Sequence, residues 1–470
     1  MTVLVWERVG SPAANHRASP SAARRGDSEE KGKPTGIQPK LRRDAATTNP
    51  AQRGLRSPMT EHPPRSRRSR RPDLVLLGGP GPTRTIPIAR PRRPALDDVV
   101  ARLRPSYDEG MLTNGGLVRE LEQAMAERLG VVHVIATSSC TSALMLVVQA
   151  LIEGRPGPVV MPSFTFSATA HAVAWNGREP RFVEMDPATF QVDPDAFAAA
   201  LPGASAAMAV HLYGAPATPA VLESLAADAG VPLLFDAAHA IGARSGGRAI
   251  GGFGVAEVFS LTPTKVMVAG EGGLVATDDD DLAARLRIGR SYADPGDYDT
   301  QFNGMNARMS ELHAAVALES LKLLDSSLER RRSIAACYGD AFASVPGVSP
   351  QVVPDEDVSS YKDFTFSVEA AVFGLTRDEL VAVLASEGID TRNYFDPPTH
   401  RQRAYRHIDA PELPVTDAIA SSVVSIPIYP DLLHEEQDRI IEVIEDAHRH
   451  AAELRAVLAD QDPGSRRVGR

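Results

Sequence analysis

The chain has 470 residues, of which 43% are hydrophobic and 23% are charged, and its formal net charge is -10. That length predicts two or three domains with sizeable cores rather than one. No apolar run approaches the roughly 18 residues that a membrane span needs, which excludes a membrane protein. The two cysteines, Cys140 and Cys337, cannot form a disulfide framework or a four-thiolate zinc site, so we expect a reducing, cytoplasmic compartment.

Charge is distributed unevenly along the chain. Residues 1–72 contain 16 basic and 6 acidic residues without apolar periodicity, so we predict a disordered basic extension there. The apolar run at 3–6 is too short for a secretory signal, while a basic arm that touches nucleic acid or membrane and a true start at Met59 both remain open. The remainder has 34 basic and 54 acidic residues, a net charge of -20, which argues against a nucleic-acid partner and for small-molecule ligands.

Short apolar stretches alternate with longer amphipathic ones from about residue 116 onward. This alternation predicts a mostly parallel α/β sheet, which we assign to a large domain over residues 73–325. An amphipathic segment at 307–338 leads into a smaller α+β domain over residues 326–460, followed by a disordered tail at 461–470. The predicted strands are 133–136, 159–161, 181–185, 208–211, 232–235, 257–259 and 274–277, and the predicted helices are 117–129, 142–152, 168–175, 217–229, 377–387 and 435–454.

Polar or aromatic residues follow five of the predicted strands at their carboxyl ends. In an open parallel sheet these ends meet along one edge, and ligands bind outside that edge. The sequence therefore gathers hydroxyl groups, histidines, aromatic rings, a carboxylate and a lysine in one place. The segments are 137–141, 162–166, 211–214, 236–239 and 260–265.

This combination of groups fits pyridoxal phosphate. The helix start at 139–142 can bind a phosphate dianion, and Asp236 can keep the pyridine nitrogen protonated. Phe166 can stack on the ring, and Lys265 can form the Schiff base. Each of these residues alone has a structural explanation, namely a helix N-cap, a turn-forming acid, a core aromatic or a solvated lysine, and the histidines have one too. Their occurrence together on one edge is what favours a cofactor site.

Two further motifs are excluded as ligand sites. The apolar run at 74–77, followed by glycines, resembles a strand leading into a phosphate-binding loop, but Pro80 and Pro82 lack N–H donors and no good helix follows. The sequence therefore lacks the glycine-rich turn that a nicotinamide-dependent dehydrogenase needs. The acidic run at 278–281 lacks the spacing of a calcium loop, and no His/Cys cluster suggests a metal, so we expect none.

Several longer motifs occur in order between about residues 85 and 450. They are Ser-Cys-Thr-Ser-Ala-Leu at 139–144, Pro-Ser-Phe-Thr-Phe at 162–166, Phe-Asp-Ala-Ala-His at 235–239, Phe-Ser-Leu-Thr-Pro-Thr-Lys at 259–265, Glu-Gly-Gly at 271–273, Gly-Met-Asn-Ala-Arg-Met-Ser-Glu-Leu at 304–312, and the segments 391–400, 413–414 and 426–427. As a set they resemble the DegT/DnrJ/EryC1/StrS family of pyridoxal-phosphate-dependent sugar aminotransferases. The resemblance implies a fold-type I transferase, with a large, mostly parallel sheet domain and a smaller C-terminal α+β domain, and a homodimer with shared active sites.

The resemblance also implies roles for individual residues. Lys265 matches the lysine that binds the cofactor covalently, and its presence favours transamination over the dehydration performed by relatives with histidine there. Many relatives have glycine where Cys140 stands, so the phosphate loop must accept a Cβ here. The implied cofactor contacts are Lys265, Asp236 at the pyridine nitrogen, His239 near the phenolic oxygen, Phe166 on the ring face, Cys140, Thr141 and Ser260 at the phosphate, and Asn306 reaching into the neighbouring subunit's site.

The implied reaction moves an amino group from glutamate or glutamine to a keto-sugar, nucleotide-linked in most of the family, in the synthesis of a secondary metabolite or surface sugar. Catalysis falls to Lys265, which moves the proton, and Asp236, which holds the proton of the ring nitrogen. Tyr213, Tyr394 and His400 are candidate substrate contacts. Two alternatives remain open: an aminocyclitol-forming relative that acts on a keto-inositol, and a cofactor-binding regulatory protein, supported only by the basic extension.

Overall fold

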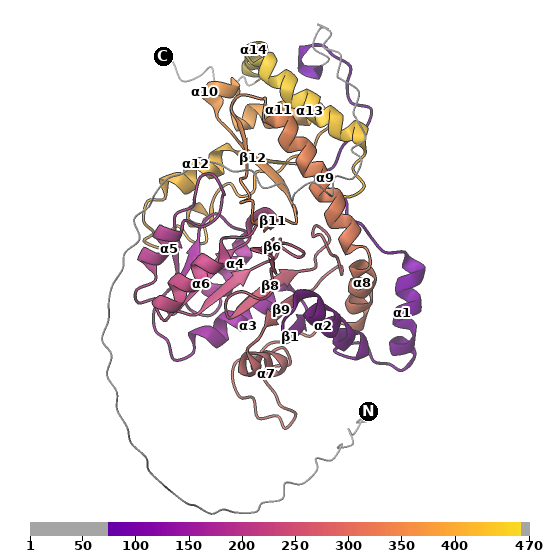
Figure 1. Cartoon of the computed structure of the whole chain (residues 1–470), viewed down its shortest axis with the longest axis vertical. Coiled ribbons are helices and arrows are strands. Elements are labelled where there is room, and N and C mark those ends of the chain that lie inside the picture. Colours follow the sequence, from indigo (N-terminus) through magenta and orange to yellow (C-terminus); the bar gives the residue numbers. More distant parts are fainter. Residues whose placement is uncertain (1–73, 462–470) are drawn as a thin grey trace, which may run out of the picture. The chain divides into compact units, whose positions relative to one another are not determined.

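The structure is a computed structural model that describes residues 74–461 (Figure 1). The predicted basic extension at 1–72 and residues 462–470 of the predicted tail lie outside the described residues. The apolar run at 74–77, which resembles a strand in the sequence, contains a 3-10 helix instead, η2 (Val75–Leu77). Among the described residues, no helix is both long and apolar enough to cross a membrane.

Seven strands form one mixed sheet with the order β1-β9-β8-β5-β4-β2-β3. β9 runs antiparallel to both of its neighbours, and the other pairs are parallel, so the prediction of a mostly parallel α/β sheet is confirmed. All the strands predicted for this sheet are present, with small shifts at their ends. They are β1 (His133–Thr137), β2 (Val159–Pro162), β3 (Pro180–Val183), β4 (Ala206–Val210), β5 (Leu233–Asp236), β8 (Ala256–Ser260) and β9 (Gly273–Thr277).

Helices cover both faces of this sheet. Alternate strand residues point to opposite faces, and both sets are apolar: Val134 packs into one hydrophobic cluster and Ile135 into another. The first cluster includes residues of α1 (Leu96–Asp108), α2 (Gly116–Leu129), α5 (Pro194–Ala200), α6 (Pro219–Asp228) and α8 (Glu311–Leu321), and the second includes residues of α3 (Cys140–Ile152), α4 (Ser167–Ala174) and α7 (Asp280–Gly289).

Helix α1 is not predicted from the sequence. Val99 is its one buried residue, and Pro105 lies inside it, so the segment shows little apolar periodicity. It packs against α2, the next helix along the chain, and against α8, which is distant in sequence. Tertiary contacts therefore decide the conformation of this segment.

A further hydrophobic cluster is built from residues between 334 and 454 together with Leu74 and Ile86. The amphipathic segment predicted at 307–338 contains two helices, since α8 ends at Leu321 and α9 begins at Leu324. The last helix, predicted at 435–454, is also interrupted, at His450. The predicted domain boundary at 325–326 falls near the start of α9 and remains a prediction. The elements are α9 (Leu324–Phe342), β10 (Val348–Pro350), β12 (Phe364–Val368), α10 (Ala370–Phe373), α11 (Arg377–Ser386), η4 (Thr399–Arg401), α12 (Pro414–Ser422), β13 (Val423–Ile426), α13 (His434–Arg449) and α14 (Ala451–Gln461).

Two small sheets complete the arrangement. β10, β12 and β13 form an antiparallel sheet within the last cluster. β11 (Asp357–Val358) pairs with β6 (Arg244–Ser245), which pairs in turn with β7 (Arg248–Ala249). The chain just before β12 is therefore fastened to the segment that follows β5, and this brings residues 359–363 beside the end of the central sheet.

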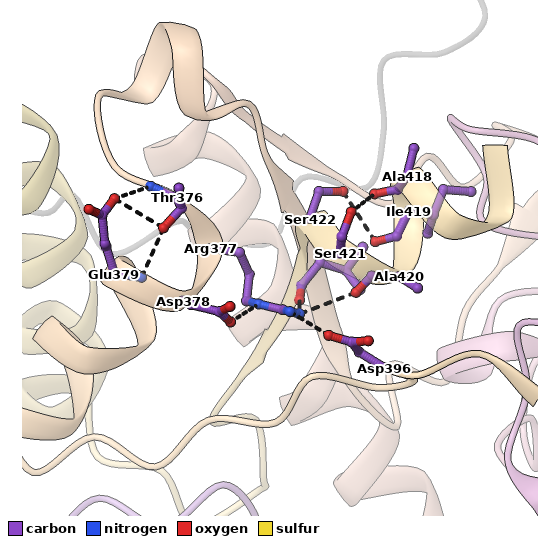
Figure 2. A network of polar contacts seen from close by, with 11 residues as sticks. Thr376, Arg377, Asp378, Glu379, Asp396, Ala418, Ile419, Ala420, Ser421 and Ser422 are labelled. Atoms are coloured by element: carbon purple, nitrogen blue, oxygen red, sulfur yellow. Dashed lines mark hydrogen bonds and ion pairs between the residues drawn. The ribbon is translucent and has the colours of Figure 1, made fainter. Parts of the chain in front are cut away.

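The start of α11 anchors a second segment near that sheet end (Figure 2). Thr376 and Glu379 form a capping box, with the Glu379 N–H donating to the Thr376 hydroxyl at 3.2 Å and the Thr376 N–H donating to Glu379 at 2.7 Å. The buried guanidinium of Arg377 donates to carbonyls in α12 and β13 at 3.2 and 3.1 Å, and to Asp396 at 2.6 Å. Arg377 thus ties α11 to residues 391–397, which we call the wall segment.

Candidate active site

A cavity of about 300 Å³ lies at the carboxyl ends of the parallel strands. Since these strands share one direction, the residues that follow β1, β2, β4, β5 and β8 all reach the same edge. The structure brings together here most of the side chains predicted from the sequence. Those that line the cavity are Cys140, Thr141, Phe166, Asp236, His239, Ser260, Lys265 and Tyr394.

Asp236, the last residue of β5, is held by two hydrogen bonds. Its Oδ2 accepts from the Thr169 hydroxyl at 2.8 Å, and its Oδ1 accepts from the Ala238 N–H at 3.0 Å. The side chain of Thr169 is in turn 2.9 Å from the Thr165 hydroxyl. Burial raises the pKa of Asp236, and the hydrogen bonds from Thr169 and Ala238 oppose that rise. The result is a carboxylate with a fixed orientation at the floor of the cavity.

Lys265 follows β8 and is only partly exposed. Burial, followed by the nearby ammonium group of Lys362, lowers the pKa of Lys265 to about 8, and the negative charges of Asp363 and Asp236 limit the effect. An amine with this pKa releases its proton far more readily than an ordinary lysine. That property suits a residue that must act as nucleophile and proton carrier.

Lys362 is a cavity residue that sequence reasoning missed. Its side chain is buried, with 6% exposure, and its Nζ lies 2.8 and 3.0 Å from the two carboxylate oxygens of Asp363. The same ammonium lies 5.1 Å from the centroid of the Tyr394 ring. Lys362 belongs to the segment that precedes β12, far along the chain from the strand ends, so no local pattern places it at the site.

His239 is oriented by a backbone donor. The N–H of Tyr213 donates to its Nδ1 at 3.2 Å, so in the neutral ring the proton is on Nε2. Burial, with the charges of Lys265 and Lys362, holds the pKa of His239 well below its usual range. His239 is therefore a neutral side chain of the cavity wall that can donate a hydrogen bond from Nε2.

The start of α3 forms one end of the cavity. Ser139 caps this helix by accepting the Ser142 N–H at 3.1 Å, while the N–H groups of Cys140 and Thr141 have no intrahelical acceptor. Gly273 at the start of β9 makes room for this helix start, since a Cβ there would lie 2.6 Å from the Cys140 nitrogen. Free N–H groups and hydroxyls at the positive end of a helix dipole are suited to a phosphate dianion.

Three predicted site residues do not line this cavity. Tyr213 is completely buried behind it and donates its hydroxyl to the carbonyl of Tyr394. His400 is buried too, with Nδ1 2.6 Å from the Ser163 hydroxyl and Nε2 3.2 Å from Asp417. The predicted substrate contacts of these two residues therefore gain no support from their positions. Asn306 is exposed, and its predicted role in a neighbouring subunit remains a prediction.

The wall segment separates the cavity from a second hollow of about 510 Å³, the side cavity. Phe166, Tyr394 and Phe395 line both spaces, and the rings of Phe166 and Phe395 lie 6.1 Å apart. Phe166 is 59% exposed, so one face of its ring is available to a ligand. The polar residues that line the side cavity are Ser167, Thr391, Arg392, Asn393, Asp396 and Gln402.

These groups fit pyridoxal phosphate as observed: a helix start with free N–H donors, a buried and oriented carboxylate, an exposed aromatic face and a lysine of lowered pKa, all on one cavity. They define the protein as a pyridoxal-phosphate-dependent transaminase with an α/β fold. The chain belongs to the DegT/DnrJ/EryC1/StrS aminotransferase family, whose model matches residues 96–445. Among residues 74–461, no group of three or more His, Cys, Asp or Glu side chains is placed to hold a metal ion.

Three named proteins are similar to this chain over most of its length. The chain is 32% identical over 353 residues to the UDP-N-acetyl-3-dehydro-alpha-D-glucosamine 3-aminotransferase of Acidithiobacillus ferrooxidans, covering 75% of this chain and 94% of that protein. It is 34% identical over 343 residues to a pleiotropic regulatory protein of Geobacillus stearothermophilus, covering 72% and 91%. The crystal structure of DesI with its TDP-sugar product superimposes with a TM-score of 0.78 at 37% identity, covering 83% of this chain and 99% of that one.

Proposed function

We propose that this transaminase moves an amino group from glutamate or glutamine to a nucleotide-linked keto-sugar and forms an amino sugar. The observation that carries the proposal is the position of Lys265 and Asp236 on one cavity, with the pKa of Lys265 lowered to about 8. The acceptor class is supported by two similar proteins, one named for a UDP-linked substrate and the other solved with a TDP-linked sugar.

In the proposed mechanism, each cavity residue has one task. Pyridoxal phosphate, when bound, supplies an electron sink that stabilises negative charge at the substrate's reacting carbon. Lys265 is the residue that would hold the cofactor covalently, and its amine would take up and return the proton that the exchange of the amino group moves. Asp236 keeps the proton on the ring nitrogen, because its carboxylate is fixed by Thr169 and Ala238.

The remaining residues bind and orient. The N–H groups of Cys140 and Thr141, with the Ser260 hydroxyl, line the same cavity and would hold the phosphate. Phe166, which lines the cavity, would lie against the ring face, and His239, whose Nδ1 accepts from Tyr213, would donate from Nε2 to the phenolic oxygen. Together these contacts would fix the position of the cofactor relative to Lys265, so that the reacting groups are held in a productive orientation.

The side cavity is the proposed binding place for the acceptor sugar. It adjoins the Lys265 cavity across the Phe166–Phe395 pair, and its polar lining offers donors and acceptors for hydroxyl and phosphate groups. Arg392 is the cation of that lining and is exposed, so it can meet a diphosphate. The side cavity, of about 510 Å³, adds space beyond the cavity assigned to the cofactor, as a second and larger substrate requires.

We also propose a cytoplasmic homodimer in which Asn306 completes the partner's site. Large apolar side chains are exposed around α1 and at the start of α8, including Leu96 at 73%, Leu112 at 45% and Leu312 at 45%. An adjoining hollow between residues 91–99 and 263–270 has a largely apolar lining. Exposed apolar surface of this kind is stabilised when another subunit covers it.

Two rival functions are tested by the same experiment. A regulatory role is favoured by the name of the Geobacillus stearothermophilus relative, and an aminocyclitol-forming role needs only a different ring ketone in the side cavity. The holoenzyme is given glutamate or glutamine with UDP-N-acetyl-3-dehydro-glucosamine, a TDP-linked keto-sugar or a keto-inositol, and amino products are identified by mass spectrometry. Amination of a nucleotide-linked sugar supports the proposal. Amination of keto-inositol alone, or of none, supports a rival.

A further inference from the structure

Tyr213 uses all three of its polar groups on segments that line the cavity. Its N–H donates to Nδ1 of His239 at 3.2 Å, and its carbonyl accepts from the N–H of Asp363 at 3.3 Å, beside Lys362. Its hydroxyl donates to the carbonyl of Tyr394 in the wall segment. One buried residue therefore contacts three parts of the chain that are remote from one another in sequence.

The backbone at Tyr213 is in an unusual conformation that serves these contacts. It lies in the left-handed region, with φ 59° and ψ 2°, which non-glycine residues rarely adopt. The following Gly214 has no side chain, and a Cβ there would collide with the Ser360 hydroxyl, which donates to the His239 carbonyl at 2.7 Å. This tight turn allows residues 359–363 to pack directly on the end of β4.

The ring of Tyr213 begins a series of aromatic contacts that runs through Phe164 and Phe395 to Phe166, which we call the contact path. The Tyr213 ring meets the Phe164 ring edge-on, with ring centroids 6.5 Å apart. The ring centroids of Phe164 and Phe395 are 6.2 Å apart, and those of Phe395 and Phe166 are 6.1 Å apart. Arg377 fastens the wall segment on its other side through Asp396 (Figure 2). The position of Phe395, and through it that of Phe166, thus depends on two buried anchors.

We propose that Tyr213 is the positioning residue of this site: its hydroxyl holds the wall segment so that Phe166 lies across the bound cofactor, while its N–H keeps His239 in the tautomer that donates from Nε2. This inference rests on the proposed place of the cofactor in the cavity. It reassigns Tyr213 from a substrate contact to a residue that acts through its neighbours.

The test compares two buried tyrosines that differ in place. Tyr213→Phe removes only the hydroxyl that holds Tyr394. The control is Tyr338→Phe: Tyr338 is equally buried and donates to the Pro427 carbonyl at 2.9 Å, but it lies in the cluster built from residues 334–454 and not at the cavity. Each variant loses the hydrogen bond that its hydroxyl donates to a backbone carbonyl, and Tyr213→Phe also loses the hydrogen bond with the Thr365 side chain. The free energies of unfolding of the two variants are therefore compared as well, so that a general loss of stability is recognised.

Two properties of each holoenzyme are measured: the visible circular dichroism of the bound cofactor, relative to its absorbance, and hydrogen exchange of the amides in 391–397. We expect Tyr213→Phe to keep the absorbance, lose at least about half of the dichroism, and exchange 391–397 about five- to tenfold faster, as loss of one hydrogen bond allows. Tyr338→Phe should change neither. Equal behaviour of the two variants would overturn the inference.

Failure of the cofactor placement gives a different result. Wild-type protein loaded with pyridoxal phosphate would then show no visible band, whereas a wild-type band with an unchanged Tyr213→Phe variant rejects only the role of Tyr213. If Tyr213→Phe does not fold, Phe395→Leu tests the same contact path without touching Tyr213. It should lower the dichroism at constant absorbance, and an unchanged spectrum would reject the path.

Discussion

The hydroxyl of Thr169 donates to Oδ2 of Asp236 at 2.8 Å, and both side chains are buried. Hydrogen bonds to the charged form of a carboxyl group favour that form, so Thr169 helps Asp236 remain a carboxylate in a site whose burial works against it. The cofactor's ring nitrogen requires such a partner.

A substitution of Asp236 should therefore slow the reaction more than a substitution of Thr169. Asp236→Asn should slow the glutamate half-reaction by at least about a hundredfold, because the ring nitrogen loses its anionic partner. Thr169→Val should slow it by only about two- to tenfold. Stopped-flow absorbance of the holoenzyme with glutamate measures both. A wild-type rate in Asp236→Asn would show that Asp236 is not the partner.

The pH dependence of Lys265 tests the electrostatics of the cavity. Only the neutral amine reacts with cyanate, so in the cofactor-free protein the rate of Lys265 carbamylation should rise with pH through a midpoint of about 8, rather than the 10.5 of an ordinary lysine. Peptide mass spectrometry over a pH series measures this rate.

Neighbouring charges should move that midpoint in opposite directions. Lys362→Gln removes a positive charge that favours the neutral amine, so the midpoint should rise, whereas Asp363→Asn removes a negative charge, so it should fall. An unmoved midpoint in Lys362→Gln would show that the charge of Lys362 does not lower the pKa of Lys265.

Glu311 should contribute to stability rather than to chemistry. This completely buried side chain accepts the N–H groups of Gly115, Leu117 and Val118 at 2.8, 2.9 and 3.1 Å, and so caps α2 from the start of α8. Glu311→Ala should lower the free energy of unfolding by about 2–4 kcal/mol, because charged hydrogen bonds to a helix start are lost.

The matched control for Glu311 is Glu442→Ala, an exposed glutamate of α13, which should change the unfolding free energy by less than about 0.5 kcal/mol. Urea unfolding of the holoenzymes provides both values. Equal effects of the two changes would contradict the capping role.

Shared active sites predict complementation between two inactive variants. Lys265→Ala and Asn306→Ala should each be inactive or nearly so as homodimers. In a mixed dimer one site has both wild-type residues, so refolding the two together should restore about a quarter of wild-type activity. If Asn306 acts within its own chain, mixing restores nothing.

The sequence predicts the sheet and the meeting of Asp236 and Lys265 on one cavity, and the physical reason is local. Asp236 is the last residue of β5 and Lys265 lies shortly after β8, two strands whose apolar runs are easily recognised, and parallel strands bring their ends together. Lys362 is placed instead by the pairing of β11 with β6, which no local pattern reveals. Tyr213 also follows a strand, yet its backbone conformation turns the ring away from the cavity, and that depends on contacts with residues 360–363.

The central claim is that Lys265 and Asp236 serve a transaminase, and the absorption spectrum of the holoenzyme tests it most directly. Wild-type protein loaded with pyridoxal phosphate should show a visible band that moves toward the near-ultraviolet when glutamate or glutamine is added. Lys265→Ala should lack the lysine-bound band while remaining folded. A wild-type band that ignores both donors, or no band after full loading, would contradict the account.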